Sequence, residues 1–236
     1  MDIKVLFESR KASRPLLVGW GISYLVDNQI LFDAGERFAY LSWNMHALGV
    51  SIGDIRSVVI SHEHWDHTNG LWDILKEKPG LPLYICPGFS LDFKSRATSY
   101  GARVIQVKPF IEIGESIYTT GEIPGGHVAS HMPEQALVLR TKRGLTVISG
   151  CAHVGIDKTV RSVKKQFSDP IHLVMGGFHT MDGPRTVILS AIDKLKRLGV
   201  ENVAPGHCTG EEGIRRLREA YGPHCADIKV GETIEI

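Results

Sequence analysis

The sequence predicts an α/β fold in which two mixed β-sheets are packed between outer helices, an αββα sandwich. Two observations lead to this prediction. The first part of the chain consists of apolar runs typical of strands, with a few helices of their own, whereas the last third alternates strand, helix, strand, helix. A β-rich stretch followed by βα units is the pattern that two sheets with helices on their outer faces produce.

The first half of the chain contains short apolar runs separated by turn residues. Strands are predicted at residues 3–8, 22–27, 29–33, 57–61, 83–86 and 104–107. Asp27-Asn28 lies between two of these runs and predicts a tight hairpin turn. Helices are predicted over residues 38–48, closed by Gly49, and around residues 71–76.

The second half begins with a further hairpin, formed by residues 135–140 and 145–149. After it, Ile188, Ile192 and Leu195 follow the spacing of one buried helix face, with Pro184 before and Gly199 after. Similar spacing predicts helices at residues 160–167 and 214–221. Because no stretch rich in Pro, Gly or Ser separates these parts, we expect a single domain over residues 1–236.

The composition is that of an ordinary globular protein, with 43% hydrophobic and 22% charged residues. No stretch approaches the roughly 18 apolar residues of a membrane span, and the N-terminus lacks a leader pattern. We therefore expect a cytoplasmic protein that has no membrane partner. The 27 basic residues are scattered and balanced by 26 acidic ones, which argues against nucleic acid as a partner. The four cysteines lie far apart and do not indicate a disulfide scaffold.

Four apolar runs end in residue types that bind metals or substrates. The residues that follow these runs are Ser61-His62, Gly150-Cys151-Ala152-His153, Gly176-Gly177-Phe178-His179 and Gly206-His207-Cys208. Since α/β proteins build their sites at strand ends, the sequence predicts a functional site here.

The strongest signal is the cluster His62, His64, Asp66 and His67, on a loop that leaves a strand and enters a helix. Imidazole and carboxylate suit zinc, iron or manganese. Alternation places His62 and His64 on one side of an extended segment while Asp66 and His67 face elsewhere. Each half could then hold its own metal, with centres roughly 3.5 to 4 Å apart. Surface histidines at a helix start, with Asp66 as a cap, are the alternative, but four ligand types directly after a buried strand favour the metal.

The cluster resembles the H-x-H-x-D-H signature of the metallo-β-lactamase superfamily, and the resemblance extends over nearly the whole chain. It implies the metallo-β-lactamase fold and two divalent metal ions, for which we expect zinc, with manganese or iron as alternatives. It also implies that His153 joins the metal of His62 and His64, and that His207 joins Asp66 and His67. The segment 30–35 resembles the family's strand ending in D-x-G, in which the Asp, here Asp33, supports the metal ligands; a turn residue before Gly35 is the alternative.

A narrower resemblance is to the dihydropterin synthase branch of this superfamily. It is carried by five ordered motifs: residues 121–124, 135–137, 149–153, 176–179 and 205–210. The branch is named for joining a pterin methyl group to a ribosylaminobenzene phosphate in methanopterin assembly, while most of its members are labelled metal-dependent hydrolases. The motifs therefore specify the branch better than the substrate.

Three residues keep open roles. Cys151 stands where many superfamily members have an Asp that bridges the two metals, and it is a bridging thiolate, a neighbour of the metals or a small buried residue. His179 is a ligand, a proton donor or a substrate contact, the alternative being a histidine satisfied by a helix start. His127 is the reserve candidate for the position of His153.

Function follows from the metals. Two divalent ions make hydroxide available near neutral pH, which indicates hydrolysis, with Asp66 orienting the nucleophile or passing a proton and His179 as a second catalytic candidate. We expect a hydrolase of a small phosphate-bearing molecule, a pterin among the candidates, whose flat ring Trp65 or Phe178 could stack against. The alternatives are a dihydropterin synthase-type transferase, a nuclease or β-lactamase-like hydrolase, and a non-catalytic metal or redox protein. The sequence does not indicate an oligomeric state.

Overall fold

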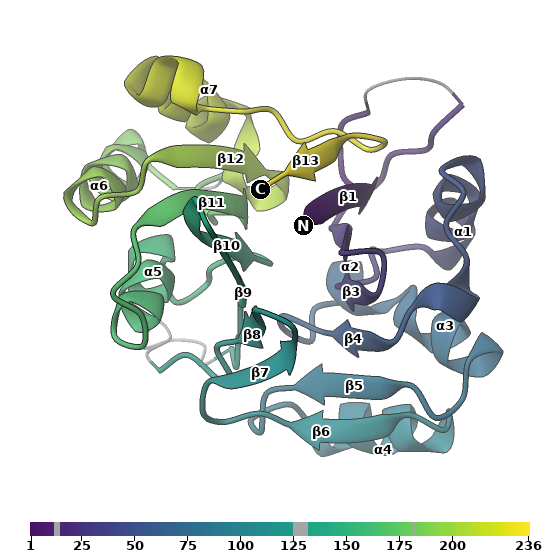
Figure 1. Cartoon of the computed structure of the whole chain (residues 1–236). Coiled ribbons are helices and arrows are strands. Elements are labelled where there is room, and N and C mark those ends of the chain that lie inside the picture. The colour runs from purple at the N-terminus through teal and green to yellow at the C-terminus, as the bar shows by residue number, and fades with distance from the viewer. Residues whose placement is uncertain (12–14, 125–131, 182) are drawn as a thin grey trace. The chain divides into compact units, whose positions relative to one another are not determined.

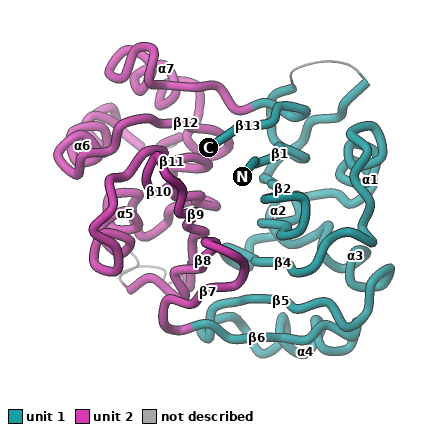
Figure 2. The backbone as a smooth tube through the Cα atoms, in the orientation of Figure 1, with its two compact units in different colours: residues 1–107, 229–236 teal, residues 108–228 magenta. Residues whose placement is uncertain are grey.

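The structure is a computed structural model that describes residues 1–11, 15–124, 132–181 and 183–236. The chain divides into two compact units, which Figure 2 colours separately. Unit 1 comprises residues 1–107 and 229–236, and unit 2 comprises residues 108–228. Each unit contains one β-sheet and its own helices (Figure 1). The single domain expected over residues 1–236 stays a prediction.

Unit 1 is built on a seven-stranded mixed sheet with the order β13-β1-β2-β3-β4-β5-β6. Its strands are β1 (Asp2–Phe7), β2 (Ser23–Val26), β3 (Ile30–Phe32), β4 (Ser57–Val59), β5 (Pro82–Ile85), β6 (Arg103–Gln106) and β13 (Thr233–Glu235). Its helices are α1 (Phe38–Ala47), η1 (Ile52–Asp54), α2 (Trp65–Thr68), α3 (Leu71–Glu77) and α4 (Leu91–Ser99). Strands β3, β4, β5 and β6 run parallel, so their carboxyl ends lie at one edge of the sheet.

The core of unit 1 lies between its sheet and helices α1, α3 and α4. Leu41 on α1 and Leu75 on α3 are fully buried in the same cluster as the strand residues Leu31, Val58 and Leu83. The i, i+4 spacing of apolar residues on these helices explains why one face of each packs on the sheet. The hairpin turn between β2 and β3 is formed as expected, with positive φ at both Asp27 and Asn28.

Unit 2 is built on a six-stranded mixed sheet with the order β12-β11-β10-β9-β8-β7. Its strands are β7 (Ile111–Gly114), β8 (Ile117–Thr119), β9 (Leu137–Thr141), β10 (Gly144–Ser149), β11 (Ile171–Gly177) and β12 (Asn202–Gly206). Its helices are α5 (Ile156–Lys164), α6 (Arg185–Arg197), η2 (His207–Thr209), α7 (Gly210–Tyr221) and η3 (Gly222–His224). Strands β10, β11 and β12 run parallel and end in register, because Ser149 pairs with Gly176 and Gly177 with Gly206.

The core of unit 2 contains the helix faces that the sequence pattern indicated. Ile188, Ile192 and Leu195 on α6 are buried together with residues of β10, β11 and β12. Helix α5 ends at Lys164, before Phe167, whereas the apolar spacing extended the helix to that residue. Phe167 instead packs on Tyr118, with ring centroids 5.1 Å apart, so its partial burial comes from an aromatic contact and not from a helix face.

Besides the 3-10 helices η1, η2 and η3, four elements of the described structure were not predicted from the sequence. These are α4, the hairpin strands β7 and β8, and the terminal strand β13. Helix α4 begins after Ser90, whose side chain accepts a hydrogen bond from Phe93 N at 3.1 Å. Serine is a preferred N-cap residue, so this start of a helix could have been recognised in the sequence. Strand β13 forms because it pairs antiparallel with β1, its distant partner in the sequence. Among the described residues, no helix is both long and apolar enough to cross a membrane.

Candidate metal centre

Asp33 organises the strand ends of unit 1. It follows β3, and Ser61 lies just after β4, its parallel neighbour. The fully buried Asp33 carboxylate accepts hydrogen bonds from Ser61 N at 2.7 Å, from Ser61 Oγ at 2.7 Å and from His67 Nδ1 at 2.6 Å. Its backbone adopts a positive φ of 59°, which Asp tolerates better than most residues. The contact with His67 fits the supporting role that the family resemblance implied.

Asp33 determines which nitrogen of two histidines is available. A carboxylate can only accept, so His67 Nδ1 carries the proton and its Nε2 keeps a lone pair. Ser61 Oγ donates to Asp33 and can therefore accept from His62 Nδ1, 2.9 Å away. His62 Nε2 then also keeps a lone pair. An orienting partner on the second ring nitrogen is typical of histidines that bind metals.

The ring nitrogens of unit 1 converge. His62 Nε2 lies 3.1 Å from His64 Nδ1, as the alternation of the two residues predicted. His67 Nε2 lies 3.5 Å from Asp66 Oδ2. The rings of His62 and His67 are also neighbours, with centroids 4.1 Å apart. After His64 the chain enters α2, and this helical turn carries the His67 ring back beside His62.

Gly21 makes room for the backbone of the cluster. It has a φ of 96°, and a Cβ atom at this position would lie 1.7 Å from the carbonyl oxygen of Asp66. No side chain fits into that space, so the chain approaches Asp66 through a residue that has none.

Gly21→Ala is therefore expected to destabilise the protein by more than the cost of placing alanine at a positive φ, because the new Cβ atom would also collide with the backbone of Asp66. Gly49 provides the control, because it also has a positive φ, 67°, but nothing lies within 4 Å of its would-be Cβ. Alanine in a left-handed conformation costs roughly 1–2 kcal/mol, which predicts a fall in Tm of about 2–8 °C for Gly49→Ala. We expect at least about twice that fall for Gly21→Ala in thermal unfolding. Equal falls would contradict the close approach to Asp66.

In unit 2, Glu134 holds the loop after β10. Its carboxylate is 1% exposed and accepts hydrogen bonds from Ala152 N at 2.5 Å and Val154 N at 3.3 Å. Its Oε2 also lies 3.7 Å from His153 Nδ1. Glu134 thus positions the predicted ligand His153, a role that the sequence analysis missed. An acidic residue directly before the predicted strand at residues 135–140 was the signal that could have indicated it.

His179 lies beside His153. Their ring centroids are 4.4 Å apart, and the ligand atoms of Cys151, His153 and His179 lie within 4.8 Å of one another. His179 has a positive φ of 51°, an unfavourable conformation of the kind found at functional sites. Both rings line a pocket of about 390 Å³ in unit 2. Phe178 also lines this pocket although it is only 3% exposed, whereas Trp65 is 52% exposed.

His207, Cys208 and Cys151 form a second group in unit 2. All three are buried, and their ligand atoms lie within 4.8 Å of one another. His207 also has a positive φ, 46°. Burial raises the pKa of the Cys208 thiol, but hydrogen bonds with Cys151 and His179 and the charge of His207 outweigh it and lower the pKa well below its ordinary value. The structure shows that Cys151 is buried among residues of the types that bind metals.

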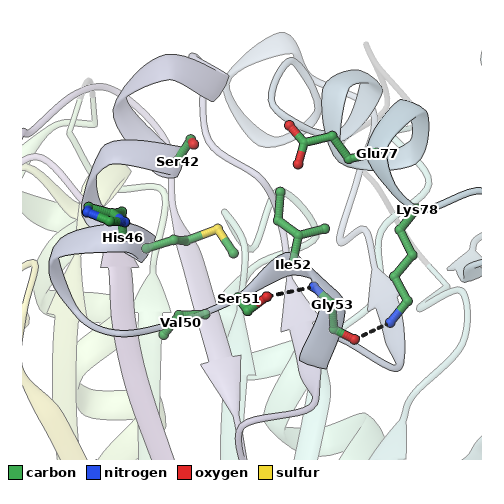
Figure 3. Close-up of a pocket in the computed structure, with 9 residues that line it drawn as sticks. Ser42, His46, Val50, Ser51, Ile52, Gly53, Glu77 and Lys78 are labelled. Atoms are coloured by element: carbon green, nitrogen blue, oxygen red, sulfur yellow. Dashed lines mark hydrogen bonds between the residues drawn. The ribbon is translucent and has the colours of Figure 1, made fainter.

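The residues present fit a divalent metal. In unit 1 the buried imidazoles of His62 and His67 lie beside the carboxylate of Asp66, and in unit 2 the buried imidazole of His207 lies beside two thiols. These are the donor types of zinc and iron sites. His127, the reserve candidate, lies outside the described residues. A further pocket in unit 1, of about 460 Å³, is lined by residues such as His46, Ile52 and Lys78 (Figure 3). None of the described residues lining it is a predicted metal ligand.

A family model matches most of the chain. The family model described as the metallo-β-lactamase superfamily matches residues 23–207. The chain belongs to this superfamily. The matched region includes all the strand ends described above, from Asp33 to His207. Its two mixed sheets and their flanking helices match the fold of the superfamily, which confirms the predicted fold class.

Three relatives of this metallo-β-lactamase superfamily member are informative. It is 28% identical to a protein of Methanocaldococcus jannaschii named 7,8-dihydropterin-6-methyl-4-(β-D-ribofuranosyl)-aminobenzene-5′-phosphate synthase, over 91% of this chain and 89% of that one. A crystal structure named a metal-dependent hydrolase of the β-lactamase superfamily is 28% identical, with a TM-score of 0.84 and coverage of 100% and 99%. The metallo-β-lactamase fold protein YhfI of Bacillus subtilis, 16% identical with a TM-score of 0.71 and 99% coverage of both chains, supports the fold alone.

Proposed function

We propose that this protein is a dinuclear metal-dependent hydrolase that acts on a small phosphate-bearing molecule. The observation that carries the proposal is the chain of hydrogen bonds from Asp33, directly to His67 and through Ser61 to His62. A buried carboxylate that leaves Nε2 of two neighbouring histidines available has a clear use in metal binding. A purely structural role would not require two such rings to meet.

Two divalent metal ions are held, in this proposal, by His62, His64, Asp66, His67, His153 and His207. Zinc is the expected metal, with manganese or iron as alternatives. When bound, such ions supply Lewis-acid chemistry and a nucleophile at neutral pH. Freshly purified protein should contain close to two transition-metal ions per chain by elemental analysis. Protein that takes up no metal after reconstitution would contradict the proposal.

The chain's own residues would orient the reacting groups and move protons. Asp66 Oδ2, beside His67 Nε2, is placed to orient a nucleophile or to accept its proton. His179, exposed at the pocket that it shares with His153, is the candidate proton donor for the leaving group. The pocket has the size of a small-molecule site and combines the apolar Phe178 with the hydroxyls of Thr186 and Ser190 and the cation of Lys194, which pairs with the pocket residue Asp157 at 3.3 Å. These features suit an organic ring that carries an anionic group.

A transferase is the second candidate, because the M. jannaschii relative is named as a synthase of a pterin-containing phosphate. The same residues would then stabilise a phosphate or diphosphate leaving group without consuming water. The even charge of the chain, 27 basic against 26 acidic residues, disfavours a nuclease.

The experiment that separates these candidates uses zinc- and manganese-loaded protein with two sets of substrates. One set contains phosphate esters and pterin phosphates in water, and release of phosphate or alcohol from them supports the hydrolase. The other set combines a pterin diphosphate with a ribosylaminobenzene phosphate, and a coupled product in mass spectrometry supports the transferase. Rapid cleavage of RNA, with no turnover in either set, would overturn both.

A further inference from the structure

The buried group Cys151, His207 and Cys208 offers two sulfur atoms and one nitrogen at one position of unit 2. The ligand atoms lie within 4.8 Å of one another. Two ligands of one tetrahedral zinc ion are roughly 3.5–4 Å apart, so small side-chain rotations would bring all three onto one ion. Cys151 belongs to the loop after β10, and His207 and Cys208 belong to η2, which follows β12. Cys208 Sγ donates a hydrogen bond to Cys151 O at 3.6 Å.

The backbone around Cys208 is shaped to keep its sulfur in this position. A Cβ atom on Gly177, at the end of β11, would lie 2.6 Å from Cys208 Sγ and 2.4 Å from the carbonyl oxygen of Gly150. The sulfur therefore occupies the space that a side chain on β11 would fill. Thr180 N and Met181 N both donate to the Cys208 carbonyl at 3.1 Å, which fixes the backbone of the residue. No disulfide engages any of the four cysteines.

We propose that Cys208 is a metal ligand and that, with Cys151 and His207, it forms a sulfur-rich metal position. This inference rests on the proposed function, since it concerns the metal that His207 binds. On metal binding, each thiol releases its proton and the thiolate sulfur coordinates the ion. Thiolate ligands select zinc, iron(II) or cobalt(II) and disfavour manganese and magnesium, which prefer oxygen. The metal bound here therefore belongs to the softer class.

Cobalt(II) substitution tests the inference, because cobalt bound to thiolate has an intense near-ultraviolet charge-transfer absorption that imidazole and carboxylate ligands do not produce. Protein loaded with two cobalt ions per chain should show this absorption. In Cys208→Ser and in Cys151→Ser its intensity per chain should fall to roughly half, and in the double variant it should vanish. Cys86→Ser and Cys225→Ser are the matched controls, since neither thiol belongs to the described group, and both should keep the full intensity.

The outcomes separate this inference from the proposed function. Full intensity in Cys208→Ser would overturn the role of Cys208, and cobalt uptake without any sulfur absorption would overturn the sulfur-rich position while leaving the metal enzyme intact. Failure to take up cobalt or zinc at all would overturn both. If the variants do not fold, X-ray absorption of the zinc-loaded wild-type protein decides, with sulfur expected at roughly 2.3 Å. A shell of nitrogen and oxygen only, or a Cys151–Cys208 disulfide in the metal-loaded protein, would contradict the inference.

Discussion

His64→Ala is expected to abolish activity and to lower the metal content while leaving the protein folded. The His64 ring is half-buried and its Nδ1 lies 3.1 Å from His62 Nε2, so its removal deletes one donor without opening a large cavity in the core. Replacement of a residue that merely supports a ligand typically costs 10–100-fold in metal affinity or activity. Loss of a ligand itself should cost more than about 100-fold.

The control for this variant is His46→Ala. His46 is also a histidine of unit 1 but is exposed on α1. Its replacement should change neither the metal content nor the activity. Metal content, activity and thermal unfolding are measured on the wild-type protein and on both variants. Full activity of His64→Ala, or equal losses in both variants, would refute the assignment of His64 as a ligand.

Asp33→Asn is expected to weaken both the fold and the metal affinity. The carboxylate accepts three hydrogen bonds with both oxygens, whereas an amide has one oxygen and an NH₂ group that would face a donor. A buried donor left without an acceptor costs about 1–3 kcal/mol. Because the amide also ceases to orient His67 and, through Ser61, His62, metal affinity should fall roughly 10–100-fold.

Asp27→Asn is the matched control, since Asp27 also has a positive φ but lies exposed in the hairpin turn before β3. Unfolding by urea in the presence of a chelator measures the first effect without metal, and competition with a metal indicator measures the second. If Asp33→Asn behaved like Asp27→Asn in both measurements, Asp33 would be only a turn residue, the alternative that the sequence left open.

The spacing of apolar residues was sufficient to predict most of the regular elements. The hairpin at Asp27-Asn28, the helix face of Ile188, Ile192 and Leu195, and the strands that precede His62 and His207 depend on local patterns. Strand β13 was missed because a three-residue strand has no pattern of its own and forms only through its pairing with β1. The end of α5 was misplaced because Phe167 is partly buried by the aromatic rings of Tyr118 on β8 and of Phe110, and not by a helix face.

The sequence by itself determined the ligand types and the order in which they appear, because H-x-H-x-D-H and the strand-end motifs are contiguous. Only the tertiary structure decided how the side chains meet. His67 returns to His62 through one turn of α2, Glu134 reaches His153 from the segment before β9, and Cys208 comes to Cys151 from another strand end. Contacts between residues far apart in the sequence follow from parallel strands ending in register, and no local pattern of residues contains that information.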